Sequence, residues 1–118
     1  MPQSWRRLVD RDGRLVDYRW CNADPVEVHL PAPGEDQLRW QWGQEEELLT
    51  VRGVTWTEAG ARWEVDRGGT SATVTLNWTD KARGLATIGL GEPVGETFVD
   101  QARLADFPQE AEEHCDEL

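Results

Sequence analysis

The sequence predicts an all-β protein, either an antiparallel β-sandwich or an up-and-down barrel, with about eight strands and at most one short helix near the C-terminus. Three observations support this fold class. Apolar and polar residues alternate with a period of two along most of the chain, as on half-buried strands. Turn signals that contain glycine or proline separate the alternating segments. The connections are short, as in an antiparallel meander. Both architectures fit this pattern.

The segment 72–78 shows the alternation most clearly. Ala72, Val74, Leu76 and Trp78 share one face, and threonine and asparagine residues occupy the other. The β-branched threonines suit a pleated surface that faces water. We therefore expect the first set to point into the core, and the other strands to follow the same plan.

In the first third of the chain, residues 5–10 and 15–21 are predicted strands. Asp12-Gly13 between them is a strong signal for a two-residue hairpin turn. A short strand follows at 26–30. The prolines of the loop 31–36 end it, because proline has no N–H to donate to a sheet.

The next two predicted strands are 37–42 and 49–56, with a charged turn at 43–47 between them. The apolar phase of the second strand slips by one residue at Gly53. We therefore expect a β-bulge there, because an extra residue allows both halves of the strand to keep their apolar side inward.

The next predicted strand, 62–67, ends at Gly68-Gly69, which is another tight-turn signal. The strand 72–78 follows this turn, and the last clear strand is 86–90. The segment 96–107 fits either a short helix or a strand, and we favour the strand. Residues 1–108 are predicted to form one β domain, and residues 109–118 an acidic, disordered tail.

Charge is the strongest feature of the composition, with a formal net charge of −11. Residues 1–21 carry five arginines against three aspartates, a net of +2, whereas residues 24–47 carry seven acids against one arginine, a net of −6. An acidic surface is repelled by phosphate backbones and anionic lipid, so we expect no nucleic acid and no membrane as partner. A basic protein is the natural partner, although acidity also keeps small domains in solution.

The start of the chain lacks the apolar segment of a secretory signal, and no apolar run is long enough to span a membrane, which favours the cytoplasm. In a reducing compartment the two cysteines, Cys21 and Cys115, are expected to be free thiols rather than a disulfide. Eleven of the twelve basic residues are arginine, which hints at a bacterial source with a GC-rich genome.

Tryptophan is abundant, and six of the seven tryptophans fall on the apolar side of their predicted strands. The simplest interpretation is that these side chains fill the core. Alternatively, some of them line a cavity for a flat or apolar ligand, because each indole N–H needs an acceptor that a crowded core supplies poorly. The candidate cavity residues are Trp40, Trp42, Trp56, Trp63 and Trp78.

Acidic residues flank the strand 37–42 on both sides, and we expect them to converge at one end of the sheet beside two tryptophans. An aromatic residue next to a charged rim is typical of a protein interface. The candidate partner-binding residues are Glu35, Asp36, Trp40, Trp42, Glu45, Glu46 and Glu47.

No catalytic motif stands out, and we expect a protein that is not an enzyme. The chain has no Gly-x-Ser-x-Gly elbow. His29 is expected on a solvent-facing strand surface and His114 in the tail. Together with Cys21 and Cys115, these histidines lack the spacing of a metal site, so no metal and no cofactor are predicted.

These observations lead to two functional hypotheses. The first is a small acidic module that binds a basic protein, for example an immunity-type inhibitor of a basic toxin or nuclease. The alternative is a β-barrel that binds a small apolar or aromatic ligand in a cavity lined by tryptophan. The oligomeric state stays open.

Overall fold

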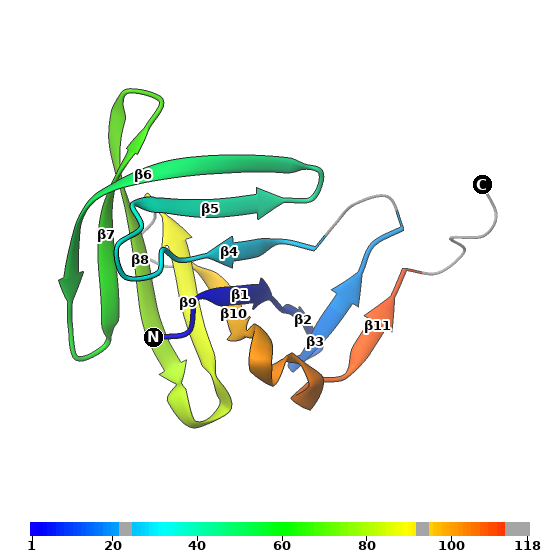
Figure 1. Cartoon of the computed structure of the whole chain (residues 1–118). Helices are drawn as coiled ribbons and strands as arrows, with labels where there is room; N and C mark the ends of the chain where they lie inside the picture. Colours follow the sequence, from blue (N-terminus) through cyan, green and yellow to red (C-terminus); the bar gives the residue numbers. More distant parts are fainter. Residues whose placement is uncertain (22–24, 92–94, 113–118) are drawn as a thin grey trace.

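The computed structural model describes residues 1–21, 25–91 and 95–112, and eight of its strands close into an antiparallel barrel (Figure 1). The order of strands around the barrel follows their order in the chain, so the architecture is the up-and-down barrel and not the sandwich. The barrel strands are β1 (Ser4–Arg7), β4 (Glu27–His29), β5 (Gln37–Trp42), β6 (Glu45–Trp56), β7 (Gly60–Arg67), β8 (Thr70–Asp80), β9 (Leu85–Leu90) and β10 (Glu96–Asp100).

The first strand closes the barrel. Strand β1 pairs with β4 on one side and with β10 on the other, so that Trp5 lies opposite both Val28 and Asp100. This closure joins the two ends of the meander β4 to β10 and leaves no free edge in the barrel.

The predicted turns and the predicted bulge are confirmed. Asp12 and Gly13 have φ values of 57° and 84°, as a two-residue type I′ hairpin turn requires, and Gly68-Gly69 forms the same kind of turn between β7 and β8. The register between β6 and β7 shifts between Val51 and Gly53. The expected charged turn is shorter than predicted, because β6 already begins at Glu45.

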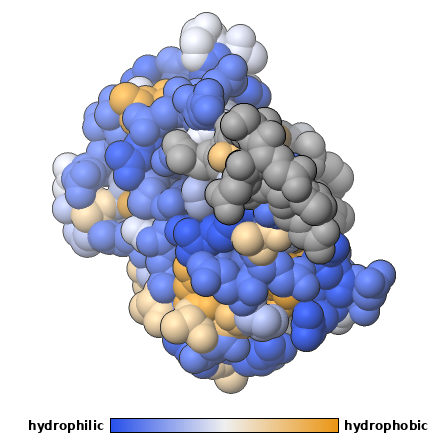
Figure 2. Space-filling model, turned by 90° about the vertical axis from the view of Figure 1, so that its right-hand side faces the viewer, coloured by the Kyte–Doolittle hydropathy of each residue, from blue (hydrophilic) through white to orange (hydrophobic). Residues whose placement is uncertain are grey.

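A second, smaller sheet lies beside the barrel. It consists of β2 (Val9–Arg11), β3 (Arg14–Arg19) and β11 (Gln109–Ala111), and β11 runs parallel to β3. Figure 2, which views the molecule from the right-hand side of Figure 1, where β3 and β11 lie, shows a mainly hydrophilic surface. The first residues of the predicted tail therefore belong to a sheet. The rest of that tail, residues 113–118, lies outside the described part of the chain.

The described part of the chain includes two short 3-10 helices, η1 (Lys81–Arg83) and η2 (Gln101–Asp106). The segment 96–107 thus divides into the strand β10 and the helix η2, so each of the two predicted states holds for part of it. Asp100 is the N-cap of helix η2, and its side chain accepts a hydrogen bond from the backbone N–H of Ala102.

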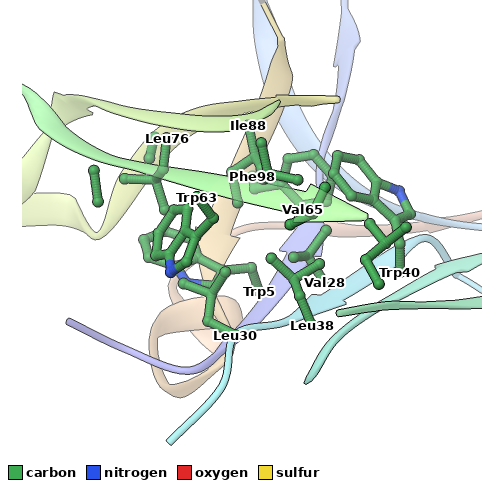
Figure 3. Close-up of a cluster of buried hydrophobic side chains, with 14 residues drawn as sticks. Trp5, Val28, Leu30, Leu38, Trp40, Trp63, Val65, Leu76, Ile88 and Phe98 are labelled. Carbon is green, nitrogen blue, oxygen red and sulfur yellow. The ribbon is translucent and has the colours of Figure 1, made fainter. Parts of the chain in front are cut away.

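Fourteen buried side chains fill the interior of the barrel (Figure 3). Trp5, Leu38, Val74 and Leu76 have no exposed surface, and Trp40 and Trp63 lie at opposite ends of the cluster. A separate small cluster of Leu8, Leu85, Val99 and Phe107 lies outside this core. Among the described residues, the centre of the barrel is thus a packed core.

The prediction that six tryptophans form the core is wrong in part. Trp5, which the alternation did not assign to the core, is completely buried, whereas Trp20 and Trp56 are 46% and 63% exposed. Alternation indicates which face a side chain occupies but not how far along the barrel it lies. Trp20 follows the small sheet and Trp56 lies at the end of β6, so neither reaches the packed interior.

Cys21 is disulfide-bonded in the structure, so the expected free thiol is wrong at this residue. The other cysteine, Cys115, lies outside the described residues. The backbone N–H of Cys21 also donates a hydrogen bond to Glu112 Oε2, at 2.8 Å.

Candidate functional site

The end of the barrel that carries the N-terminus is hollowed, and we call this hollow the apolar mouth. Its volume is about 490 Å³. Besides Met1, Gln3 and Glu35, it is lined mainly by apolar side chains, of which the chief ones are Leu30, Pro31, Pro33, Val54, Trp56 and Trp63.

The bulge in β6 builds one wall of the mouth. Beyond Gly53, Val54 pairs with Trp63 and Trp56 pairs with Ala61, and residues that pair directly point to the same face of a sheet. Since Trp63 and Ala61 are buried, Val54 and Trp56 lie on the inner face. They are nevertheless exposed, because β6 extends past the packed interior.

The loop between β4 and β5 builds the opposite wall. The backbone N–H of Leu30 donates to the carbonyl oxygen of Gln3 at 2.7 Å, which ties the start of the loop to the N-terminal segment. Pro31 and Pro33 carry no N–H, so the apolar wall they form presents no unpaired donor at these positions.

Two tryptophans give the mouth an aromatic wall and floor. The ring of Trp56 meets that of Trp63 edge to face, with centroids 6.2 Å apart and planes at 73°. Because Trp63 is buried and Trp56 is mostly exposed, Trp63 forms part of the floor and Trp56 stands at the rim. An aromatic or aliphatic ligand could cover both indoles.

A second hollow, of about 200 Å³, lies at the other end of the barrel, and we call it the stacked-Trp hollow. Trp40 and Trp42 stack there with ring centroids 5.3 Å apart and planes at 21°. The Arg67 guanidinium lies 5.8 Å from the centroid of Trp42. Other lining residues are Val26, Ile88, Gly89, Leu90 and Glu96.

The five tryptophans predicted to line one cavity therefore do not do so, because the packed core separates the two ends. Trp56 and Trp63 belong to the apolar mouth, and Trp40 and Trp42 to the stacked-Trp hollow. Trp78 packs against Trp5, with ring centroids 5.4 Å apart, and lines a further hollow beside the mouth together with Trp56.

The predicted acidic cluster is also divided, and the expected convergence at one end is wrong. Asp36 lies at the mouth end of β5, where its carbonyl oxygen accepts from the backbone N–H of Val51 at 2.7 Å. Glu45 pairs with Trp42 at the other end of β5. From Asp36 to Trp42, the cross-strand partner of Glu45, the chain runs six steps of about 3.4 Å, roughly 20 Å. Glu35 lies next to Asp36 in the chain, before β5, whereas Glu46 and Glu47 follow Glu45 on β6.

Two of these glutamates are already paired inside the molecule. Glu47 accepts two hydrogen bonds from Arg67, at 2.6 and 3.1 Å, in the bidentate geometry typical of arginine and carboxylate. Glu46 lies 3.9 Å from Arg39. The acidic charge at this end of the barrel is therefore partly neutralised.

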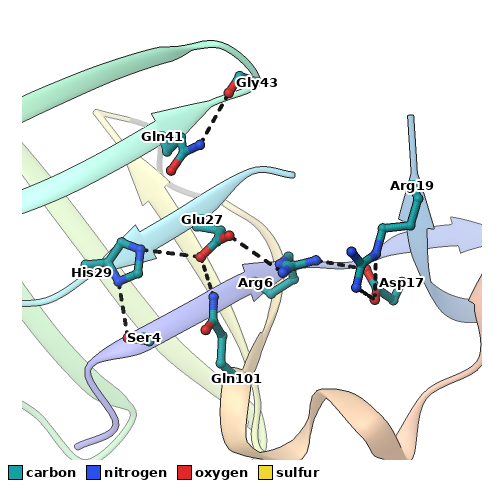
Figure 4. A network of polar contacts seen from close by, with 9 residues as sticks. All are labelled: Ser4, Arg6, Asp17, Arg19, Glu27, His29, Gln41, Gly43 and Gln101. Carbon is teal, nitrogen blue, oxygen red and sulfur yellow. Dashed lines mark hydrogen bonds and ion pairs between the residues drawn. The ribbon is translucent and has the colours of Figure 1, made fainter. Parts of the chain in front are cut away.

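A polar network that the sequence did not reveal joins the barrel to the small sheet (Figure 4). Asp17 is only 3% exposed, and its carboxylate accepts hydrogen bonds from Arg6 and Arg19 at 2.9 to 3.2 Å. The other end of the Arg6 guanidinium lies 3.6 Å from Glu27. Arg6 and Arg19 of the basic N-terminal segment thus serve internal ion pairs.

His29 extends this network on the outward face of β4, the face predicted for it. Its Nδ1 lies 3.1 Å from Ser4 Oγ, and its Nε2 lies 3.4 Å from Glu27 Oε2. Burial, reinforced by the charge of Arg39, lowers the pKa of His29, although Glu27 acts in the opposite direction. Glu27 also accepts a hydrogen bond from Gln101. These contacts hold strands together, and we assign the network a structural role.

The described residues contain no group of three or more His, Cys, Asp or Glu side chains that could hold a metal ion. Within residues 1–21, 25–91 and 95–112, no helix has the length and apolar character needed to cross a membrane. In comparisons with known proteins, no family model, no curated protein and no solved structure matches the chain. Function is therefore inferred from the residues of the barrel themselves.

Proposed function

We propose that the protein binds a small apolar or aromatic molecule in the apolar mouth. The observation that carries this proposal is the exposure of Trp56 and Val54, 63% and 42%, on the wall of a concave site of about 490 Å³. This volume falls in the range of known small-molecule sites, which are mostly apolar and largely preformed.

Physical arguments favour an apolar ligand. Covering apolar surface contributes roughly 2.5 kcal/mol for each 100 Å² removed from water. Because the barrel interior is filled, a ligand would lie on the floor formed by Trp63 rather than inside the core. Polar groups at the rim, such as Gln3 and Glu35, could orient a ligand that also carries a donor.

Fluorescence titration with N-phenyl-1-naphthylamine, a neutral apolar probe, tests the proposal. The wild-type protein should enhance probe emission in a saturable way, and Trp56→Ala should weaken binding by about tenfold. Trp20→Ala, which removes another exposed tryptophan outside the mouth, is the matched control and should leave binding unchanged. Equal effects of the two variants, or no saturable binding, would count against the proposal.

Binding of a basic protein, including inhibition of a basic toxin or nuclease, is the second candidate. It is supported by the net charge of −11 and by Glu45 and Glu46, which are exposed on β6 close to Leu48, itself 55% exposed. The double variant Glu45→Lys and Glu46→Lys should slow association with a basic protein captured by the wild type, most strongly at low salt. An unchanged association rate would contradict this candidate.

A further inference from the structure

Trp40 lines the stacked-Trp hollow, and its indole N–H is buried. Trp40 is 5% exposed, and among the described residues its Nε1 has no hydrogen-bond partner. Figure 3 shows Trp40 at the end of the core cluster away from Trp63, with its nitrogen on the outer side. An indole nitrogen can only donate, so among the described residues this group lacks the acceptor that buried donors normally have.

The other lining groups indicate the kind of molecule that carries the acceptor. The ring of Trp42, stacked on Trp40, offers a flat aromatic surface. Arg67 is held by Glu47 in a bidentate pair, and Glu96 at the rim pairs with Arg7 at 2.9 Å. Since both charges in the lining are neutralised within the protein, the hollow favours a neutral molecule over an ion.

The size of the hollow suits a ligand of about one ring. A dry cavity of about 150 Å³ in another protein is large enough to bind benzene. The stacked-Trp hollow has about 200 Å³, which leaves room for a ring and a small substituent.

We propose that the stacked-Trp hollow is a second binding site, which takes a small, neutral, flat molecule whose carbonyl oxygen accepts a hydrogen bond from Trp40 Nε1. Aryl ketones, aldehydes and amides have this chemistry. The site lies at the opposite end of the barrel from the apolar mouth and does not depend on the function proposed there.

Nuclear magnetic resonance of the indole N–H groups tests this proposal directly. Acetophenone has one ring and one carbonyl acceptor, whereas ethylbenzene has nearly the same shape and no acceptor. Acetophenone should move the Trp40 indole proton downfield in a saturable way, and ethylbenzene should not. The Trp40 signal is assigned by its loss in Trp40→Phe.

Variants provide a second measurement. Trp40→Phe keeps an aromatic ring but removes the donor, and should weaken acetophenone binding by about tenfold. Trp63→Phe makes the same change at the other end of the barrel and should leave the Trp40 shift intact. Equal responses to both probes, or a Trp40 signal unmoved up to the solubility limit, would overturn the proposal. Shifts confined to Trp56 and Trp63 would also overturn it while supporting the apolar mouth.

Discussion

Replacing Asp17 by alanine should destabilise the protein more than any exposed charge replacement. The carboxylate of Asp17 accepts from Arg6 Nη1 at 3.2 Å and from Arg19 Nε and Nη2 at 3.1 and 2.9 Å. The Arg6 side chain is only 12% exposed, so its guanidinium would lose a partner without returning to water. Removal of one member of a buried pair typically costs about 3–5 kcal/mol.

The lower end of that range applies here. Arg19 is 42% exposed and can be resolvated, and Arg6 keeps Glu27 at 3.6 Å. We expect a loss of about 3 kcal/mol in the free energy of unfolding and a fall in Tm of roughly 10 °C.

Urea denaturation followed by tryptophan fluorescence measures this change. Asp106→Ala, which removes an exposed partner of Arg103 at 2.9 Å, is the control and should cost under about 0.5 kcal/mol. In a double-mutant cycle, Asp17→Ala combined with Arg6→Ala should cost at least about 1 kcal/mol less than the two single changes added together. Additive effects, or an Asp17 variant as stable as the control, would refute the assigned role of this network.

Two other predictions concern close packing and pH. A Cβ at Gly60 would lie 1.9 Å from the carbonyl oxygen of Leu76, so Gly60→Ala should lower the free energy of unfolding by about 1–3 kcal/mol. A Cβ at Gly53 meets nothing within 4 Å, so Gly53→Ala should change that free energy by less than about 1 kcal/mol. Similar losses for the two variants in urea denaturation would contradict this prediction. Because the pKa of His29 is lower in the folded than in the unfolded chain, protons bind the unfolded state first, and the free energy of unfolding should decline as pH falls below about 6.5. His29→Gln should flatten that decline, and a folded-state titration midpoint of His29 above 6.5 would show that burial is not the dominant effect.

Much of the fold could be predicted because it depends on interactions between near neighbours in the chain. Asp12-Gly13 and Gly68-Gly69 take positive φ values that glycine and asparagine-like residues accept, so their turns could be located from residue types alone. The slip in phase at Gly53 located the bulge for a similar reason.

The candidate site was predictable only in its residue types. Trp56 and Trp63, which the sequence named as candidate cavity residues, line the apolar mouth, and Trp56 lies on the inner face of β6 as the alternation predicted. Their separation from Trp40 and Trp42 was not predictable, because the period of two carries no information on depth along the barrel axis. Trp5 was missed because β1 has only four residues and pairs with β10, which lies far away in the sequence. The burial of Asp17 was missed because it depends on the contact with Arg6 of β1, between the small sheet and the barrel.

The sequence by itself determined the strands from β4 to β9 with their inner faces, the tight turns and the bulge, since these depend on alternation and on backbone preferences within a few residues. Tertiary structure alone decided that β1 closes a barrel, that Asp17 becomes a buried partner of Arg6, and that the tryptophans divide between two ends. Such outcomes depend on which distant segments pair and where the packed core stops. Those are properties of the closed sheet as a whole, and no local pattern of residues encodes them.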